Sequence, residues 1–454
     1  MSRRPTDAEP RQPFVIPLLV AAVLAACSGP EDGPETDLPH VLLIVIEGAR
    51  ADHFSTNGYE RDTTPTLNWI AERGTVFTRA ASQSSATLPS LVSLFTGRRL
   101  ASECARIPAG ASTLAELLGR AGYRTGAFVD NPLLGGLGGF DRGFEQFSTQ
   151  AGTKDLQSWL RRQEPGPVFT YVHLSDPRPP YAPKVAAHHF VKQGGGLDLT
   201  QRRYCEMLSQ REGLVDLAGA VSRIERGIDG YDDDLRLADA RLPAIITTLR
   251  KTGAWANTVV VVASTHGQAL WEHPRDPTCL EKRAAEGPLA VDEYLQSGQG
   301  GLLYQELVHV PLVLRVPGRR PAARVDDPVE NADILPTLLS LTGLEPPPDL
   351  DGQSLRNYLW KAEENPEPGP AVSVTRLAEA IQVPAGWKLI RPTADGAEAG
   401  LEVELYDLND DPAERSNLAA EHPEVVLALG DDLDRMLSKG LQPRAAGAAA
   451  LARD

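Results

Sequence analysis

Two nearly continuous apolar runs constrain the fold of this 454-residue chain more than any other feature. His40–Ile46 and Val259–Ala263 are rich in β-branched residues and lack the alternation of a half-exposed strand. This pattern is typical of strands buried on both faces of a parallel sheet. Each run ends abruptly in polar residues, Glu47 after the first and Thr265 with His266 after the second. Ligands of open α/β sheets gather at the carboxyl ends of strands, so these two ends are the first candidate site.

Stretches with apolar residues at helical spacing accompany the two runs. They include Leu67–Arg73, Thr113–Ala121 and Leu235–Lys251. Helices that alternate with buried strands predict an α/β fold, a mostly parallel, doubly wound sheet with helices on both faces. Residues 190–230 and 274–300 are predicted to be loop-rich or helical excursions rather than core strands.

The C-terminal part of the chain predicts a smaller α+β subdomain. Beyond the proline run that ends at Pro348, residues 372–390 and 403–408 have the composition of a second, smaller sheet. Lys388 within it is predicted to be a surface or packing residue. A helix and an Ala-rich tail follow.

The N-terminus has the pattern of a secretory signal. Basic residues precede a short apolar stretch, Phe14–Ala26, which is too short to span a membrane permanently. The stretch ends in Leu-Ala-Ala-Cys, which resembles a bacterial lipobox with Cys27 as the lipidated first residue of the mature protein. The alternative is a plain secretory signal with an incidental cysteine. Polar residues 28–38 then form a tether. We therefore expect a lipid-anchored, extracytoplasmic protein of the cell envelope, in the outer membrane.

Charge and cysteine usage limit the partners. The net charge of −16 argues against nucleic acid, because phosphate neutralisation needs clustered Lys and Arg. Beyond Cys27, three cysteines remain in an oxidising compartment, so at most one intramolecular disulfide can form. Cys205 with Cys279 is the predicted pair, because both lie in apparent insertions. Nothing in the sequence indicates an oligomeric state.

Short motifs follow one another from residue 40 to about residue 420. They are Ile46–His53, Thr64–Leu67, Gly74–Ala80, Thr87–Ser90, Leu94–Arg98, Val172–Tyr181, Tyr231–Leu242, Thr265–Gly267, Leu303–Leu312, Asp333–Leu339 and Glu404–Leu418. Each motif is weak alone, but the set in this order resembles the bacterial sulfatases of the alkaline-phosphatase superfamily.

The resemblance implies a domain organisation. Residues 1–27 are the lipoprotein signal peptide and 28–38 the tether. Residues 39–345 correspond to the sulfatase-like α/β domain and 346–425 to its C-terminal subdomain. Residues 426–454 are left as the C-terminal helix and tail.

The resemblance also implies a hard divalent cation, calcium or magnesium, held by carboxylates at the two strand ends. Glu47 stands at the first ligand position and is still anionic, whereas Gly48 offers no side chain. Thr265 stands where the family has Asp, followed by an intact His266, and Gln268 replaces an acid. Hydroxyl and imidazole groups do not replace a carboxylate for calcium. We expect a degenerate metal site of Glu47, His266 and Thr265, with weak affinity.

Thr87 occupies the nucleophile position of the resemblance. Sulfatases make formylglycine there from Cys or Ser, so no formylglycine is expected at Thr87. Threonine nucleophiles occur in phosphodiesterase-like branches of the superfamily, which favours phosphoryl over sulfuryl transfer. The alternative interpretation is that Thr87 only caps the helix that begins near Pro89.

Other positions of the implied site are also changed. Leu91 replaces an Arg, Arg178 replaces a His, and Gln299 replaces a His that could act as a general acid. Arg178 can restore a cation. Arg50 and His173 remain as further catalytic candidates, although Arg50 can equally form a local ion pair with a neighbouring acid, and His173 can be structural.

Two functions remain open at this point. One is a metal-assisted hydrolase of sulfate or phosphate esters outside the cytoplasm, with reduced activity and with Thr87 as nucleophile. The other is a catalytically inactive pseudosulfatase that binds envelope glycans or a protein partner through the same cleft. A sulfated or phosphorylated small molecule or glycan is the expected ligand class, and fold-level resemblance cannot decide between the two functions.

Overall fold

The computed structural model describes residues 38–100, 104–136, 138–150, 152–181, 189–319, 323–359 and 368–439. The predicted signal peptide, the lipidation site Cys27 and the Ala-rich tail lie outside the described residues. No described helix is both long enough and apolar enough to cross a membrane.

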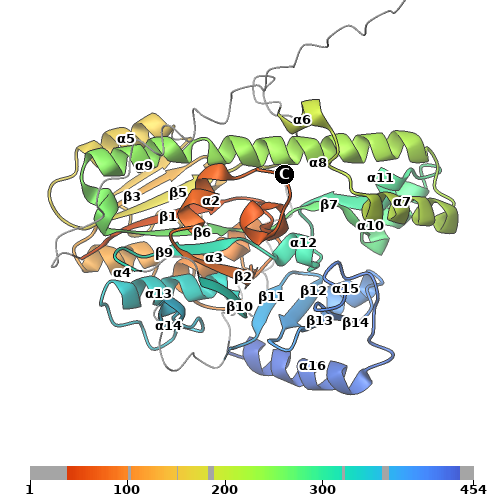
Figure 1. Ribbon diagram of the computed structural model, residues 1–454. Coiled ribbons are helices and arrows are strands. Elements are labelled where there is room, and N and C mark those ends of the chain that lie inside the picture. The colour runs from red at the N-terminus through yellow and green to blue at the C-terminus, as the bar shows by residue number, and fades with distance from the viewer. Residues whose placement is uncertain are drawn as a thin grey trace, which may run out of the picture.

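A central sheet of eight strands organises the molecule (Figure 1). Its strand order is β10-β2-β9-β6-β1-β5-β3-β4. Neighbouring strands pair in parallel except at β9, which is antiparallel to both β2 and β6. The strands are β1 (His40–Ile46), β2 (Thr75–Ala81), β3 (Arg124–Val129), β4 (Gln146–Thr149), β5 (Val168–Leu174), β6 (Thr258–Ser264), β9 (Leu312–Arg315) and β10 (Ala323–Glu330). Both predicted apolar runs are thus central, adjacent strands.

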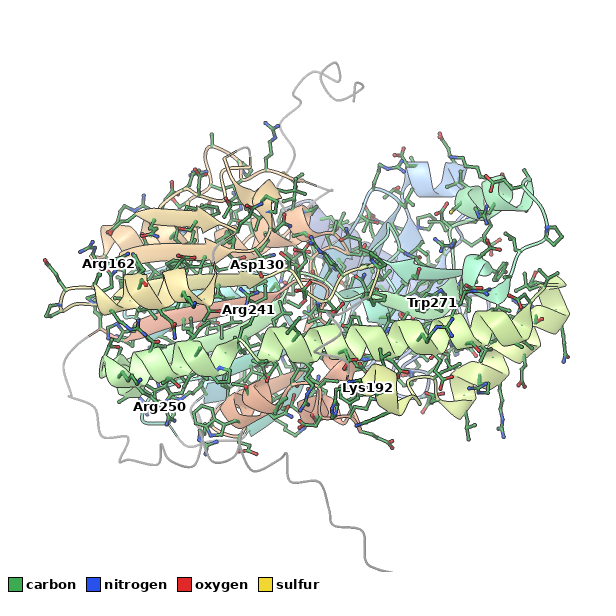
Figure 2. The ribbon with its side chains drawn as sticks, turned by 90° about the horizontal axis from the view of Figure 1, so that it is seen from above. Asp130, Arg162, Lys192, Arg241, Arg250 and Trp271 are labelled. Atoms are coloured by element: carbon green, nitrogen blue, oxygen red, sulfur yellow. The ribbon has the colours of Figure 1, made fainter. Side chains whose placement is uncertain are left out.

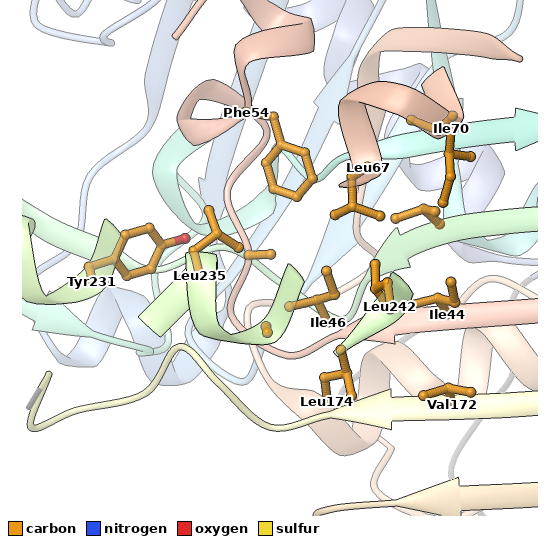
Figure 3. Packing of buried hydrophobic residues seen from close by; sticks show 14 of the residues in the cluster. Ile44, Ile46, Phe54, Leu67, Ile70, Val172, Leu174, Tyr231, Leu235 and Leu242 are labelled. Atoms are coloured by element: carbon orange, nitrogen blue, oxygen red, sulfur yellow. The ribbon is translucent and has the colours of Figure 1, made fainter. Parts of the chain in front are cut away.

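Helices cover both faces of this sheet, which explains why β1 has no polar face. Successive residues of β1 point alternately into two separate hydrophobic cores, Ile44 into one and Val45 into the other. The first core, part of which Figure 3 shows, includes residues of α2 (Pro65–Ala71), α5 (Thr153–Arg161), α8 (Leu217–Asp239) and α9 (Leu242–Lys251). The second includes residues of α3 (Thr87–Thr96), α4 (Leu114–Arg120) and α13 (Ile334–Leu341). The predicted doubly wound α/β fold is confirmed.

A smaller antiparallel sheet forms the C-terminal subdomain, as predicted. Its strands, in the order β11-β12-β13-β14, are β11 (Ala371–Val374), β12 (Ala378–Gln382), β13 (Trp387–Pro392) and β14 (Glu404–Asp407). Helix α16 (Pro423–Leu437) packs against this sheet through Leu429, Leu433 and Leu437. Figure 1 shows this subdomain below the main domain. A separate two-stranded antiparallel sheet is formed by β7 (Ala269–Pro274) and β8 (Leu295–Gly298).

Four buried charged or titratable residues lie where the two parts meet, and we call them the joint: Lys388, Glu414, His273 and Glu306. Within the subdomain, the Lys388 Nζ lies 2.7 Å from Glu414 Oε1, and both side chains are almost fully buried. Lys388 also donates to the carbonyl oxygen of Leu303 in the main domain, at 2.6 Å. The His273 ring lies 2.7 Å from the Glu306 carboxylate and 3.0 Å from the carbonyl oxygen of Glu414. The ion pair with Glu414 therefore holds Lys388 in place for its hydrogen bond to Leu303, which joins the subdomain to the main domain.

Excursions from the central sheet are mainly helical, as predicted. Residues 190–230 hold α6 (Phe190–Gln193), α7 (Leu199–Glu212) and most of α8, and residues 274–300 hold α10 (Pro277–Ala284) and α11 (Val291–Tyr294) before β8. Further short α-helices are α12 (Gln305–Val308), α14 (Arg356–Leu359) and α15 (Ala394–Glu398).

Two sequence predictions are wrong. The single helix predicted over Leu235–Lys251 is the end of α8 and the whole of α9, with Ala240 and Arg241 between them. The Cys205–Cys279 disulfide does not form, and all three cysteines in the described ranges are free. Cys205 is buried inside α7 and packs in the first core, whereas Cys279 lies on α10 and is only partly buried.

Candidate functional site

Strand register brings the two predicted strand ends together. Ile46 of β1 lies opposite Leu174 of β5 on one side and Ser264 of β6 on the other. Glu47 and Thr265, each one residue further along, therefore leave the sheet at the same level. The site predicted from two separate apolar runs is thus one place at the carboxyl edge of the sheet.

Thr87 is the first residue of α3 and points into this place. Its hydroxyl donates to Glu47 Oε1 at 2.5 Å and lies 3.2 Å from Nε2 of His266. The residue before it, Ala86, is the N-cap, and no side chain caps the helix. The interpretation of Thr87 as a simple helix cap is therefore wrong, because its hydroxyl is directed at the strand ends.

Glu47 is the centre of the cluster. Besides Thr87, its carboxylate is hydrogen-bonded by His173 Nε2 at 3.0 Å and by Asn131 Nδ2 at 3.2 Å. Burial favours the neutral acid, but hydrogen bonds from the surrounding groups, His173 foremost and then Thr87, lower the pKa of Glu47 to about 2. Glu47 is therefore a carboxylate at any physiological pH.

His173 is oriented by a second buried residue, Tyr171. The Tyr171 hydroxyl lies 2.8 Å from His173 Nδ1, and burial raises the pKa of Tyr171 well above its usual value. The phenol therefore keeps its proton and can donate it to Nδ1. The tautomer with hydrogen on Nε2 then satisfies both ring nitrogens, because Nε2 faces Glu47. Tyr171, His173, Glu47 and Thr87 form one continuous hydrogen-bonded chain.

His266 approaches Thr87 from the β6 side. Its Nδ1 lies 2.6 Å from the carbonyl oxygen of Gly267, which accepts and so places hydrogen on Nδ1. Burial lowers the pKa of His266. The lone pair on Nε2 then faces the Thr87 hydroxyl, which makes His266 a second acceptor for the Thr87 proton.

The residues present do not fit a hard divalent cation. Calcium and magnesium need several oxygen ligands with negative charge. Here the Glu47 carboxylate already accepts hydrogen bonds from Thr87, His173 and Asn131, and a cation would have to displace these donors. Among the described residues, no group of three or more His, Cys, Asp or Glu side chains is placed to hold a metal. The buried Thr265 hydroxyl has no hydrogen-bond partner, but it is neutral.

Gly48 supplies no side chain that could bind a metal at this edge of the sheet. A single substitution at this position does not easily add one. Its backbone has φ of +73°, and a Cβ built on it would lie 2.8 Å from the carbonyl oxygen of Pro177. The loop that follows β5 therefore occupies the space that a side chain at position 48 would need.

Arg50 and Arg178 lie outside the hydrogen-bonded chain around Thr87. The Arg50 guanidinium binds both oxygens of Asp52, at 2.9 and 2.7 Å, and also contacts Glu272. It is almost fully buried, so the predicted local ion pair is present and Arg50 offers no free charge to a ligand. Arg178 is exposed in the loop after β5, where its charge acts on Asp176.

Sequence reasoning missed two members of the site, Asn131 and Tyr171. Asn131 follows β3, which is the next parallel strand beyond β5, so the same strand-end rule pointed to it. Tyr171 lies two residues before His173 on one strand, which places both side chains on the same face.

The comparisons with known proteins identify the family. A family model described as Sulfatase matches residues 39–344. This chain belongs to the sulfatase family. Arylsulfatase K from Mus musculus is 31% identical over 206 residues, a match that covers 43% of this chain and 33% of the mouse protein. The matched segment of this sulfatase-family chain thus spans about a third of the length of that relative.

Solved structures share the sulfatase fold. The phosphonate monoester hydrolase of Agrobacterium radiobacter superposes with a TM-score of 0.67 at 20% identity, covering 89% of this chain and 96% of that chain. A structure in complex with its substrate D-glucosamine-2-N,6-O-disulfate superposes with a TM-score of 0.66 at 16% identity, covering 88% and 98%. Sulfatases are generally metal-dependent, so the lack of fit to a cation separates this site from the usual chemistry of its family.

Proposed function

We propose that this protein is a lipid-anchored, extracytoplasmic member of the sulfatase family that has lost metal-dependent ester hydrolysis and keeps the strand-end site around Glu47 for binding. One observation carries the proposal, the Glu47 carboxylate that accepts hydrogen bonds from Thr87, His173 and Asn131. In the family's chemistry a cation acidifies the nucleophile and offsets the charge of the ester. Here the Thr87 hydroxyl instead donates a hydrogen bond to an anion.

Electrostatics oppose turnover of a sulfate or phosphate ester at this place. An anionic ester that approaches Thr87 meets the ionised Glu47, and Arg50 is already neutralised by Asp52 and Glu272. Repulsion between like charges at about 4 Å amounts to roughly 4 kcal/mol near a protein surface. Because the residues around Glu47 do not favour a bound cation, no metal charge offsets this repulsion. The repulsion therefore raises the activation barrier for hydrolysis of the ester.

A glycan fits the same geometry better. Sugar hydroxyl groups donate hydrogen bonds, and Glu47 accepts them strongly because it is ionised. A sulfate or phosphate substituent on the glycan would be directed away from Glu47, toward the exposed Arg178. The proposed ligand class is therefore a sulfated or phosphorylated glycan or small molecule of the envelope, held through its hydroxyl groups. The lipid anchor at Cys27 would keep the protein where such ligands occur.

Residual hydrolysis is the second candidate function, and the position of Thr87 favours it. Its hydroxyl has two acceptors within hydrogen-bond distance, Glu47 and His266. In this route the Thr87 oxygen attacks the phosphorus or sulfur atom while His266 takes the Thr87 proton, and His266 then gives that proton to the oxygen of the departing alcohol. Water then hydrolyses the ester on Thr87.

Calorimetry with calcium, magnesium, manganese and zinc on the chain from Ser28 onward tests the proposal. We expect no binding at millimolar metal and no rise in melting temperature. Tight binding at one site, with turnover of aryl sulfates or aryl phosphates that Thr87→Val abolishes, would contradict the binding-protein proposal and support the second candidate.

A variant pair sharpens this test. Thr265→Asp adds a second carboxylate beside Glu47, so we expect measurable calcium or magnesium affinity and a melting temperature that rises with metal. Thr265→Asn is the matched control without the charge, and metal should leave its melting temperature unchanged. An unchanged affinity in Thr265→Asp would show that position 265 does not face the cation position of the family.

A further inference from the structure

A group of cations lies at the opposite end of the central sheet from the candidate site. Helices α5 and α9 pack side by side, since Gln157 donates to the carbonyl oxygen of Ala244 and to the Thr248 hydroxyl. Each helix is followed by a strand of the parallel sheet, β5 after α5 and β6 after α9. Their C-terminal ends therefore meet at the amino edge of the sheet.

Arg161, Arg162 and Lys251 occupy these helix ends, and we call them the basic rim. All three are exposed, and no ion pair to any of them occurs within the described ranges. Unpaired cations gathered at one edge stand out in a chain whose net charge is −16. Figure 2 shows Arg162 and Arg250 at this end of the molecule, well away from Trp271.

A hollow of about 730 Å³ opens between the segments that carry the basic rim. It is lined by Leu160 and Leu249, which precede the cations of the rim, and by Leu42 of β1. The lining of the hollow also includes one acidic residue, Glu164. The hollow thus has both apolar and polar lining residues, Gln163 and Thr252 among the polar ones, and it lies beside the basic rim.

One partly exposed aromatic residue, Trp69 of α2, lies beside the end of α9. The Trp69 ring is partly exposed and lies under two guanidinium groups, with Arg73 at 4.4 Å and Arg250 at 5.1 Å from its centroid. The rings of Trp69 and Trp255 are 5.6 Å apart. Tryptophan beside basic residues is a combination found at membrane–water interfaces.

The course of the chain leads to the same end. Leu38 lines the hollow and is exposed. Cys27 precedes Leu38 by 11 residues (38 − 27). Even a fully extended chain of this length reaches only about 40 Å, so a lipid on Cys27 would lie within that distance of the hollow.

We propose that the basic rim is a membrane-docking surface that binds anionic lipid headgroups. The proposal does not depend on what the candidate site binds, and it needs no acyl group on Cys27. A simpler explanation of the three cations is that they stabilise helix C-termini, since a cation there interacts favourably with the helix dipole. The two explanations differ in vesicle binding.

Flotation with lipid vesicles tests the proposal on the chain from Ser28 onward, which contains every described residue and no acylated cysteine. We expect binding to vesicles of phosphatidylcholine and phosphatidylglycerol in a ratio of about two to one, and none to phosphatidylcholine alone. Raising the salt from about 0.05 M to about 0.5 M should release the protein, because the Debye length shortens to a few ångström.

Charge reversal identifies the surface. Arg161→Glu, Arg162→Glu and Lys251→Glu together should lower partitioning into the anionic vesicles by roughly 100-fold, at about fivefold per cation. The control carries the same change in net charge at exposed cations elsewhere and should bind within about tenfold of the unchanged chain. Its substitutions are Lys192→Glu, Arg203→Glu and Lys282→Glu.

Three results would overturn the proposal. One is equal loss of binding in the control variant, which would show a general charge effect. The second is a rim variant that unfolds at lower temperature but binds vesicles normally, which would assign the cations to helix stability alone. The third is binding of inorganic phosphate that the rim variant abolishes while vesicles bind neither protein, which would assign an anion site with no membrane role.

Discussion

The candidate site and the joint both bury carboxylates, but they compensate them differently. In the joint, Glu414 has the ammonium of Lys388 within ion-pair distance. In the candidate site, Glu47 is held by hydrogen-bond donors that include the uncharged groups of Thr87 and Asn131. A carboxylate paired with a buried cation stabilises the fold and is not available to a ligand. A carboxylate that accepts hydrogen bonds from hydroxyl and amide groups can accept hydrogen bonds from a ligand in their place. This difference assigns a structural role to Glu414 in the joint and a binding role to Glu47 in the candidate site.

The largest expected effect is in the joint. Lys388→Met leaves Glu414 buried without its cation, and such a change costs about 3–5 kcal/mol. Urea unfolding monitored by circular dichroism measures it. Arg376→Met is the control, because the Arg376–Asp395 pair is mostly exposed and contributes at most about 1 kcal/mol. Equal effects of the two substitutions would mean that the joint does not stabilise the fold.

The next largest effect is a pH dependence that originates in the candidate site. Because the folded pKa of Glu47 is about 2, below its unfolded value, Glu47 stabilises the fold above the unfolded pKa of 4.5. That stability is lost as the pH falls from 4.5 toward 2, and it amounts to roughly 3 kcal/mol. Glu47→Gln should therefore show a smaller loss of unfolding free energy over this range, measured by urea unfolding at each pH. Parallel curves for the two proteins would contradict the low pKa.

A smaller effect is expected for the Thr87 hydroxyl. Thr87→Val removes a hydrogen bond to an ionised group, which is worth about 2 kcal/mol of unfolding free energy. Thr96→Val is the matched control on the same helix, because the Thr96 hydroxyl donates to the backbone carbonyl of Val92 and its loss costs about 1 kcal/mol or less. A Thr87→Val protein that is no less stable in urea than Thr96→Val would place Thr87 outside the Glu47 cluster.

The smallest expected effect is that of a reductant. Cys104, Cys205 and Cys279 are free, so neither the joint nor the site depends on a disulfide between them. Dithiothreitol should leave the melting temperature of the chain from Ser28 unchanged. A clear decrease would show a disulfide, since loss of a native one costs about 2–5 kcal/mol.

Much of the fold follows from local patterns in the sequence. The runs at β1 and β6 predict central strands because burial on both faces leaves no polar positions, and their abrupt polar ends predict where Glu47 and Thr265 meet. The helix break between α8 and α9 could have been predicted, because Pro243 lies in the first turn of α9 and a proline inside a helical pattern marks a helix start or end.

Long-range contacts explain what the sequence could not predict about the site and the joint. The residues around Lys388 in the sequence do not indicate that it forms an ion pair. It is fully buried, and its partner Glu414 comes from another segment of the subdomain. Two donors to Glu47, Asn131 and His173, likewise lie 84 and 126 residues away along the chain. Local composition does not encode such pairings.

Gly48 limits which substitutions can add a metal ligand to this site during evolution. Any side chain added at this position would have to adopt a φ of +73° and would meet the carbonyl oxygen of Pro177. A single substitution at 48 therefore supplies a new ligand only if the loop after β5 moves with it. A metal centre rebuilt at this edge would therefore take its new ligand from a position such as Thr265 rather than from position 48.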